Sequence, residues 1–241
     1  MPTSAASRTP RARALTAARA LLEGVLSLVY PPACVACSAR LPHEGALPLC
    51  PRCLAALEPA DAGELAAHVG AGAPGTPLDG TLALWRYDAA GPLRPLLHGL
   101  KYGNRPRYGA LLGAPLGRAW AERHAPPDAL VPLPLHRARF LERGYNQSVL
   151  LADGAADVLG VPVAGSLLRR ARRTETQTHF DRSARRANVD HAFASAPEAA
   201  GLRLALVDDV ITTGATALAA ADALRAAGAA EVWLMAVAWT R

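Results

Sequence analysis

Lysine and aromatic residues are scarce in this 241-residue sequence, which has one lysine, Lys101, and only 5% Phe, Trp and Tyr. Sequence-tolerant binders of single-stranded nucleic acid usually stack bases on aromatic side chains, so the composition does not favour that class. The chain also has no GxxxxGK[ST] motif and no GxGxxG after a predicted strand, which argues against P-loop NTPases and dinucleotide-binding domains. A phosphoacceptor receiver domain needs a lysine late in the chain, whereas the single lysine here lies far upstream of the paired aspartates at 208 and 209.

Long apolar segments are missing as well. The longest uncharged runs fall short of the roughly 18 to 20 residues that span a bilayer. The start of the chain has the basic-then-apolar order of an export signal, but Glu23 interrupts it and the cleavage signature is poor. Apolar residues recur there at helical spacing instead, namely Leu15, Ala18, Leu22, Leu26 and Val29. We therefore expect residues 1–30 to form a tail with a short amphipathic helix, in a cytoplasmic protein with no membrane span.

The rest of the composition is that of a folded, basic protein. Apolar residues make up 51% of the chain, and its length allows one medium domain with a small appendage. The net charge of +6 favours a polyanionic partner, such as nucleic acid or a phosphorylated metabolite. The charge is uneven, because seven arginines lie between residues 169 and 186 against only Glu175 and Asp181.

The four cysteines form two CxxC pairs in one short window: Cys34, Cys37, Cys50 and Cys53. Two such pairs on tight turns are typical of a tetrahedral zinc site, and prolines flank both pairs here. Four thiolates leave no open position for catalysis, so we predict a structural Zn²⁺ ribbon over residues 31–57. An iron–sulfur cluster is an alternative, and two disulfides are another, although disulfides need an oxidising compartment. Residues 58–79, rich in Ala, Gly and Pro, are expected to be a linker.

Residues 80–241 show alternating strand and helix patterns. Strands are predicted at 81–87, 129–133, 161–168, 202–207 and 232–238, and helices at 93–99, 108–123, 146–159 and 215–227. The continuous apolar run at 202–207 is typical of a strand that is covered on both faces. We therefore predict an α/β domain with a parallel sheet, in which ligands bind at the carboxyl ends of the strands.

The stretch VDDVITTGAT places Asp208 and Asp209 at the end of a buried strand, before a small loop and a helix. The helix N-terminus favours an anion, Gly214 allows close backbone approach, and the threonines add hydroxyl donors for a phosphate. Two carboxylates beside a phosphate need another task, and accepting hydrogen bonds from the 2- and 3-hydroxyls of a ribose is one. The residues predict a ribose-5-phosphate site. The alternatives are a Mg²⁺ site and an acidic turn with no ligand.

This stretch resembles the phosphoribosyl pyrophosphate (PRPP) signature of type I phosphoribosyltransferases. Together with the cysteine ribbon, GLKYGNR at 99–105, VPLPLHRARFLERGYNQS at 131–148 and the arginine-rich tract at 167–189, it resembles the ComF family of competence-associated proteins. The resemblance covers nearly the whole chain from about residue 20. It implies a type I phosphoribosyltransferase-like parallel-sheet core with a small N-terminal zinc ribbon.

The resemblance also implies roles for individual residues. Asp208 and Asp209 are the expected catalytic pair and bind the ribose hydroxyls of PRPP, which Mg²⁺ accompanies. The remaining PRPP-binding residues would be Thr212, Thr213, Gly214, Ala215 and Thr216. The pyrophosphate and lid positions would be Lys101, Arg137, Arg139, Arg143, Gln177, Arg182 and Arg185, because arginine grips phosphate oxygens bidentately. A solvated basic surface is the alternative for these arginines.

Two functions stay open at this point. The first is a PRPP-dependent transferase that joins phosphoribose to an unknown nitrogen acceptor. The second is a non-catalytic protein that binds single-stranded DNA and uses the same fold and ribbon as a scaffold. The family resemblance associates both with natural competence and DNA transformation, and implies DNA-uptake or DNA-processing partners.

Overall fold

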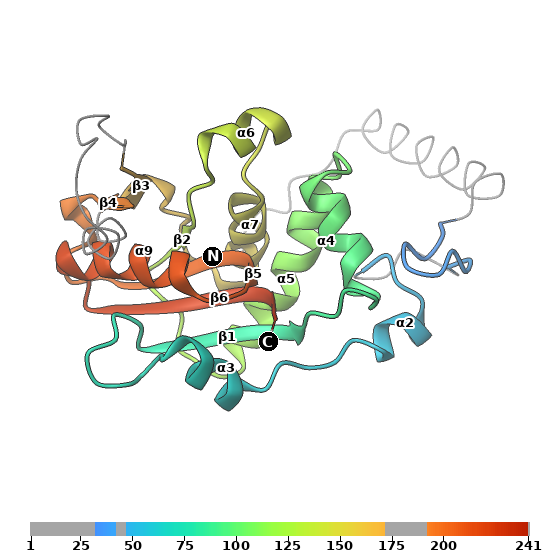
Figure 1. The fold of residues 1–241 in the computed structure, drawn as a ribbon, viewed down its shortest axis with the longest axis horizontal. Coiled ribbons are helices and arrows are strands. Elements are labelled where there is room, and N and C mark those ends of the chain that lie inside the picture. Colours follow the sequence, from blue (N-terminus) through green and yellow to red (C-terminus); the bar gives the residue numbers. More distant parts are fainter. Residues whose placement is uncertain (1–31, 42–46, 172–191, 241) are drawn as a thin grey trace, which may run out of the picture.

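The computed structural model describes residues 32–41, 47–171 and 192–240 (Figure 1). Its centre is a four-stranded parallel sheet in the order β1 (Gly80–Arg86), β6 (Glu231–Trp239), β5 (Arg203–Ile211) and β2 (Ala129–Pro132). The two central strands, β5 and β6, are almost entirely buried, as their unbroken apolar runs require. The predicted parallel α/β core is confirmed.

Helices cover both faces of this sheet. One face packs on α4 (Leu93–Lys101), α5 (Arg107–Ala121) and α7 (Gln147–Leu159), and the other packs on α3 (Ala62–Val69) and α9 (Ala215–Ala226). Side chains of β5 alternate between the two cores: Ala205 and Val207 belong to the first, and Leu204 and Leu206 to the second. Apart from α3, which lies in the segment expected to be a linker, the patterns of the sequence locate these elements to within a few residues, with one exception among the predicted strands.

The exception is the strand predicted at residues 161–168, which is wrong. Only Val163 forms a single bridge, to Leu130 at the edge of the main sheet. Pro162 has no N–H to donate to a ladder, and the chain then turns through η1 (Gly165–Leu167). It next forms β3 (Leu168–Arg170), which pairs antiparallel with β4 (Phe193–Ser195) in a separate two-stranded sheet. The remaining short elements are α2 (Pro51–Ala55), α6 (Arg137–Arg143) and η2 (Pro197–Ala199).

Residues 58–79, expected to be a linker, pack against the main domain. Pro59 bridges to Trp85 at the β1 edge of the sheet, and helix α3 follows with Asp61 as its N-cap. Leu65 is fully buried in the same core as α9. This segment therefore covers one edge and part of one face of the sheet, although its Ala and Gly content hides the apolar stripe.

The predicted amphipathic helix within residues 1–30 lies outside the described residues. Among the helices that the structure describes, none is both long enough and apolar enough to cross a membrane.

Glycines bring α5 and α7 into very close contact. A Cβ added at Gly113 would lie 2.2 Å from the backbone oxygen of Leu151, and one at Gly109 would lie 2.2 Å from Cβ of Leu150. Both contacts are far below van der Waals distance, so the two helices approach at a separation that only glycine permits. Helix α7 also carries Ser148 toward the end of β5, so this packing positions part of the candidate site.

We predict that Gly113→Ala destabilises the protein by about 1–3 kcal/mol, because the helices must separate to admit the methyl group. Alanine has the higher helix propensity by about 1 kcal/mol, so a site with spare room would give stabilisation instead. Chemical denaturation measures the difference. A variant that is more stable than the parent would contradict the close packing of α5 and α7.

Candidate functional site

A cleft of about 910 Å³ opens at the carboxyl ends of the strands, beside the point where the chain changes faces. After β2 the chain runs through α6 into α7, which packs on one face of the sheet. After the neighbouring strand β5 it runs into α9 on the opposite face. Loops that diverge from adjacent strands leave a crevice, and open α/β sheets bind their ligands there.

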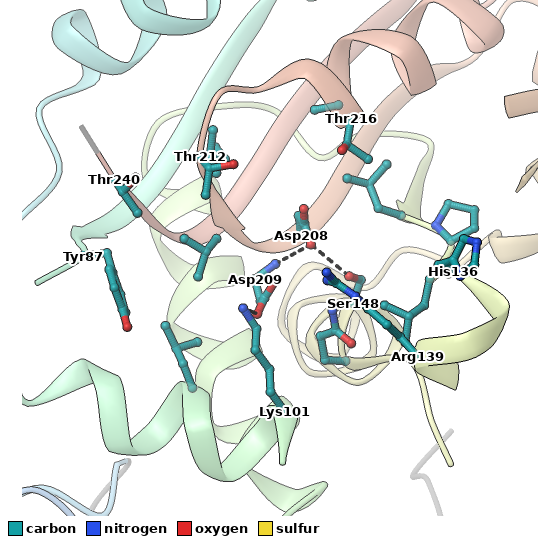
Figure 2. Close-up of a pocket in the computed structure, with 18 of the residues that line it drawn as sticks. Tyr87, Lys101, His136, Arg139, Ser148, Asp208, Asp209, Thr212, Thr216 and Thr240 are labelled. Carbon is teal, nitrogen blue, oxygen red and sulfur yellow. Dashed lines mark hydrogen bonds and ion pairs between the residues drawn. The ribbon is translucent and has the colours of Figure 1, made fainter. Parts of the chain in front are cut away.

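Asp208 and Asp209 lie inside this cleft, on β5 itself (Figure 2). The sequence predicts a strand that ends at Val207, whereas β5 continues to Ile211 and includes both acids. Asp208 Oδ1 accepts hydrogen bonds from the Asp209 backbone N–H at 2.8 Å and from Ser148 Oγ at 3.2 Å. Asp209 is only 4% exposed, and its Oδ2 lies 2.5 Å from Nζ of Lys101 on α4.

The two carboxylates are electrostatically coupled. Burial raises the pKa of Asp208 to about 7, and the neighbouring Asp209 carboxylate adds to the rise, while the Lys101 ammonium opposes it. At neutral pH the Asp208 carboxyl is therefore partly protonated, and the pair carries less than two negative charges. Its carboxylate oxygens can accept hydrogen bonds from hydroxyl groups of a ligand, which replace hydrogen bonds to water.

The loop from Thr212 to Thr216 forms the adjacent wall, and all five of its residues line the cleft. Gly214 is the N-cap of α9 with a φ of 73°, a left-handed conformation that glycine adopts without strain. Helix α9 follows immediately, so the N–H groups of its first turn and its dipole face the cleft. This end of the cleft is built for an anion.

Helix α3 supports this loop from behind, which the sequence did not indicate. His68 Nε2 lies 2.6 Å from the carbonyl oxygen of Thr212, and its ring contacts Trp239 with centroids 5.5 Å apart. A Cβ on Gly214 would come within 2.4 Å of Cγ1 of Val69. The segment expected to be a linker thus holds the anion-binding loop in place.

Several of the predicted basic residues meet at the cleft. Lys101, Arg139 and Arg143 line it, whereas Arg137, on the same helix as the two arginines, does not. Arg143 donates to the amide oxygen of the buried Gln147 at 2.9 Å. Gln177, Arg182 and Arg185 lie outside the described residues, so their assignment to a lid stays a prediction.

Arg170 is a cleft residue that sequence reasoning did not single out within its arginine-rich tract. Its Nε donates to the carbonyl oxygen of Pro134 at 2.9 Å, and its guanidinium lies over the Phe193 ring at 4.9 Å. Burial lowers the pKa of Arg170, and repulsion from Arg139 lowers it further, while attraction to Asp208 opposes both effects. Two guanidinium groups that repel each other favour an anion between them.

Ser148 and His98 are two further cleft residues to which the sequence motifs assign no role. Ser148 stands two residues after Asn146, which caps α7 and also donates from its Nδ2 to the carbonyl oxygen of Leu133 at 2.9 Å. These two hydrogen bonds fix the start of α7 beside Asp208. His98 is exposed and lines the cleft from α4. The motif GYNQS was the one available signal for Ser148.

The four cysteines come together at the other predicted site. Their sulfur atoms all lie within 4.8 Å of one another, with 3.6 Å between those of Cys37 and Cys50, and none is in a disulfide. Tetrahedral thiolates about 2.3 Å from a zinc ion would be roughly 3.8 Å apart, which this cluster approaches. The cluster can therefore hold a metal ion.

The backbone supports this metal-binding geometry. Burial raises the pKa of Cys34, but hydrogen bonding to backbone groups of Cys50, Ala36 and Cys37 outweighs it and lowers the pKa to about 6. The neighbouring Cys37 sulfur and burial raise the pKa of Cys53 to about 12. A thiolate is the form that binds metal, so metal binding to this cluster would release protons. Cys34 and Cys50 also belong to the same core as α4 and α5, so the ribbon packs on the main domain.

We predict that the purified chain contains one zinc ion and that Cys53→Ser loses it. Removing one of four ligands breaks the closed shell, so the melting temperature should fall by several degrees. Native mass spectrometry and thermal unfolding measure the two effects. Arg52→Gln, which changes the neighbouring exposed residue, should leave both unchanged. Protein purified under reducing conditions with no bound metal would contradict the assignment.

We predict that titration of Asp208 lowers the free energy of unfolding of the ligand-free protein as the pH rises from about 4 to about 7. The folded state holds a proton at Asp208 that the unfolded chain, with its ordinary pKa, releases in this window. Asp208→Asn should flatten this slope in denaturation curves, and Glu198→Gln, at an exposed acid outside the cleft, should not. An unchanged slope in Asp208→Asn would contradict the raised pKa.

A protein-family model covers part of the candidate site, and a solved structure is similar to part of the chain. The family model described as "Phosphoribosyl transferase domain" matches residues 146–241, which include Ser148, both aspartates and the anion loop. Glutamine PRPP amidotransferase from B. subtilis has a TM-score of 0.41 at 23% identity, over 58% of this chain and 30% of that one.

Several curated proteins have a higher sequence identity to this chain. The DNA utilization protein YhgH of Salmonella typhi is 36% identical over 155 residues, which is 61% of this chain and 68% of that protein. YhgH of Escherichia coli K12 is 34% identical over 157 residues, with the same coverage of both chains. Competence protein F of Haemophilus influenzae is 38% identical over 109 residues, which is 44% of this chain and 48% of that one. The chain therefore belongs to the family of YhgH and Competence protein F, and its segment that matches the phosphoribosyl transferase domain supplies part of the cleft.

Proposed function

We propose that the cleft binds PRPP and that the protein transfers its phosphoribosyl group to a nitrogen acceptor. One observation carries the proposal. An acidic pair, the half-buried Asp208 and the buried Asp209, shares the cleft with an anion loop at a helix N-terminus and with several arginines. PRPP has the matching set of groups, with a 5-phosphate, two ribose hydroxyls and a pyrophosphate.

Each part of the ligand has a partner in this arrangement. The 5-phosphate lies against the backbone of residues 212–216, where the α9 dipole and threonine hydroxyls favour it. The ribose hydroxyls donate to Asp208 and Asp209. The pyrophosphate meets Arg139 and Arg170, whose mutual repulsion an anion relieves.

Mg²⁺ would accompany PRPP in this proposal. The donor set fits, because carboxylate oxygens of Asp208 and Asp209 are the hard ligands that Mg²⁺ prefers, directly or through the hydroxyls they hold. When bound, the ion neutralises charge on the pyrophosphate. The residues of the chain orient the sugar and exclude water around it.

The transfer step is a substitution at the anomeric carbon. The lone pair of the acceptor nitrogen forms the new C–N bond, while the bond from that carbon to the pyrophosphate oxygen breaks and its electron pair leaves with pyrophosphate. Any proton on the acceptor nitrogen is released to solvent. The anionic pair beneath the ribose stabilises positive charge that develops on the sugar ring.

The names of the relatives support a place for this chemistry in DNA use. We propose that the protein serves competence or DNA utilization, with DNA-processing partners, in the cytoplasm, where thiols stay reduced and bind zinc. Binding of single-stranded DNA is the second candidate. Its main support, the arginine-rich tract, extends beyond the described residues, whereas the cleft lies within them.

We predict that PRPP with Mg²⁺ raises the melting temperature, since a ligand that binds only the folded state stabilises it by about 2.7 kcal/mol at 100 times its dissociation constant. The double variant Asp208→Asn, Asp209→Asn should abolish the rise, because neutral amides no longer attract the ribose hydroxyls and the metal. Differential scanning fluorimetry measures both.

Asp157→Asn, an exposed acid outside the cleft, is the matched control and should keep the full rise. A wild-type protein whose melting temperature does not change with PRPP and Mg²⁺ would contradict the site assignment. Release of pyrophosphate, assayed across nitrogen acceptors and oligonucleotides, then separates a transferase from a binder. Single-strand affinity that falls steeply with salt, in protein that releases no pyrophosphate, would favour the DNA-binding function.

A further inference from the structure

The cleft has two unlike halves on either side of the acidic pair. Figure 2 shows Tyr87 and Thr240 on one side of Asp208 and Asp209, and His136 and Arg139 on the other. The half with Arg139 is the basic wall that the proposed function uses for pyrophosphate. The half with Tyr87 includes lining residues of α4, and the proposed function assigns it no contact with PRPP.

We propose that this second half, the α4 subsite (Tyr87, Arg94, Leu97, His98, Tyr102, Val210 and Thr240), binds a flat heteroaromatic ring that carries a carboxylate or similar anionic group. The inference rests on the proposed function, since the ring would be the acceptor that meets PRPP there. It names the chemical class of that acceptor.

One face of α4 supplies most of the subsite. Leu97, His98 and Lys101 stand three, four and seven residues after Arg94, so the four lie on a single side of the helix. All four line the cleft. Lys101 at the end of this row contacts Asp209, so the row runs directly up to the ribose position.

The chemistry of the walls favours a flat ring. Leu97 is buried, Val210 is half-buried, and Tyr87 is half-buried at the end of β1. The rings of His98 and the exposed Tyr102 contact each other with centroids 5.2 Å apart, and the Arg143 guanidinium of the basic wall lies 4.9 Å from the centroid of the Tyr102 ring. Apolar and aromatic side chains in a chain with so few aromatics are those that pack on a planar, unsaturated ligand.

The charges of the subsite select an anionic substituent. Among the described lining residues, the acids are Asp208 and Asp209, and the nearer of these to α4, Asp209, is paired with Lys101. Arg94 brings a second cation to the same helix face, with no acid opposite it among the described lining residues. A carboxylate on the ring would pair with the Arg94 guanidinium in a charge-assisted hydrogen bond.

Matched pairs of rings test the inference with and without saturating PRPP and Mg²⁺. Nicotinate and nicotinamide differ only in the anionic group, and orotate and uracil differ by one carboxylate. We expect the carboxylated ring of at least one pair to bind about tenfold more tightly in calorimetry, as one charge-assisted hydrogen bond allows. Tighter binding of the neutral partners, or no ring binding in either state, would overturn the proposal.

Variants separate this subsite from the PRPP site. Arg94→Gln should remove most of the preference for the carboxylate, and Tyr87→Leu should weaken both members of a pair about equally. Both should keep the thermal stabilisation by PRPP, so loss of that stabilisation in the wild type would count against the proposed function instead. Arg118→Gln, on α5 outside the cleft, should change nothing. An Arg94→Gln variant with the full carboxylate preference would contradict the assignment.

Discussion

A central strand of the sheet carries two adjacent carboxylates, the half-buried Asp208 and the buried Asp209, and other elements must compensate for their charge. Asp209 is tolerated there because Lys101, the single lysine of the chain, reaches it from α4. Asp208 is tolerated because Ser148 and the Asp209 backbone donate to it and because its pKa is raised. This compensation requires α4, α7 and β5 to be correctly placed relative to one another. The close packing of α5 on α7 is therefore also a condition for the site.

The anion loop at residues 212–216 depends in turn on α3, which packs on the other face of the sheet. Val69 fills the space that a side chain at position 214 would need, and His68 holds the carbonyl of Thr212. The loop is thus fixed before any ligand arrives, which lowers the cost of ordering it on binding. The ribbon adds to this rigidity, since its cysteines share a core with α4. A metal there would steady the helix that carries Lys101.

The sequence predicted those features that depend on local patterns. Buried strands, the helix capped by Asn146, the cysteine cluster and the acid–threonine loop all follow from short stretches of residues. It did not predict features that depend on distant segments meeting. Helix α3 looked like a linker because alanine and glycine obscure its two buried positions, and the strand at 161–168 failed because Pro162 removes a donor. The contact of Lys101 with Asp209 joins residues far apart in the chain, which no local pattern reports.

The proposed function requires that Asp208 and Asp209 hold a ribose while residues 212–216 hold its phosphate. A crystal structure of the protein with PRPP and Mg²⁺ would show where both groups bind. We expect both ribose hydroxyls within hydrogen-bond distance of the two carboxylates, and the 5-phosphate against the backbone of the loop before α9. A ligand with its phosphate elsewhere in the cleft, or with its ribose away from the acidic pair, would contradict it.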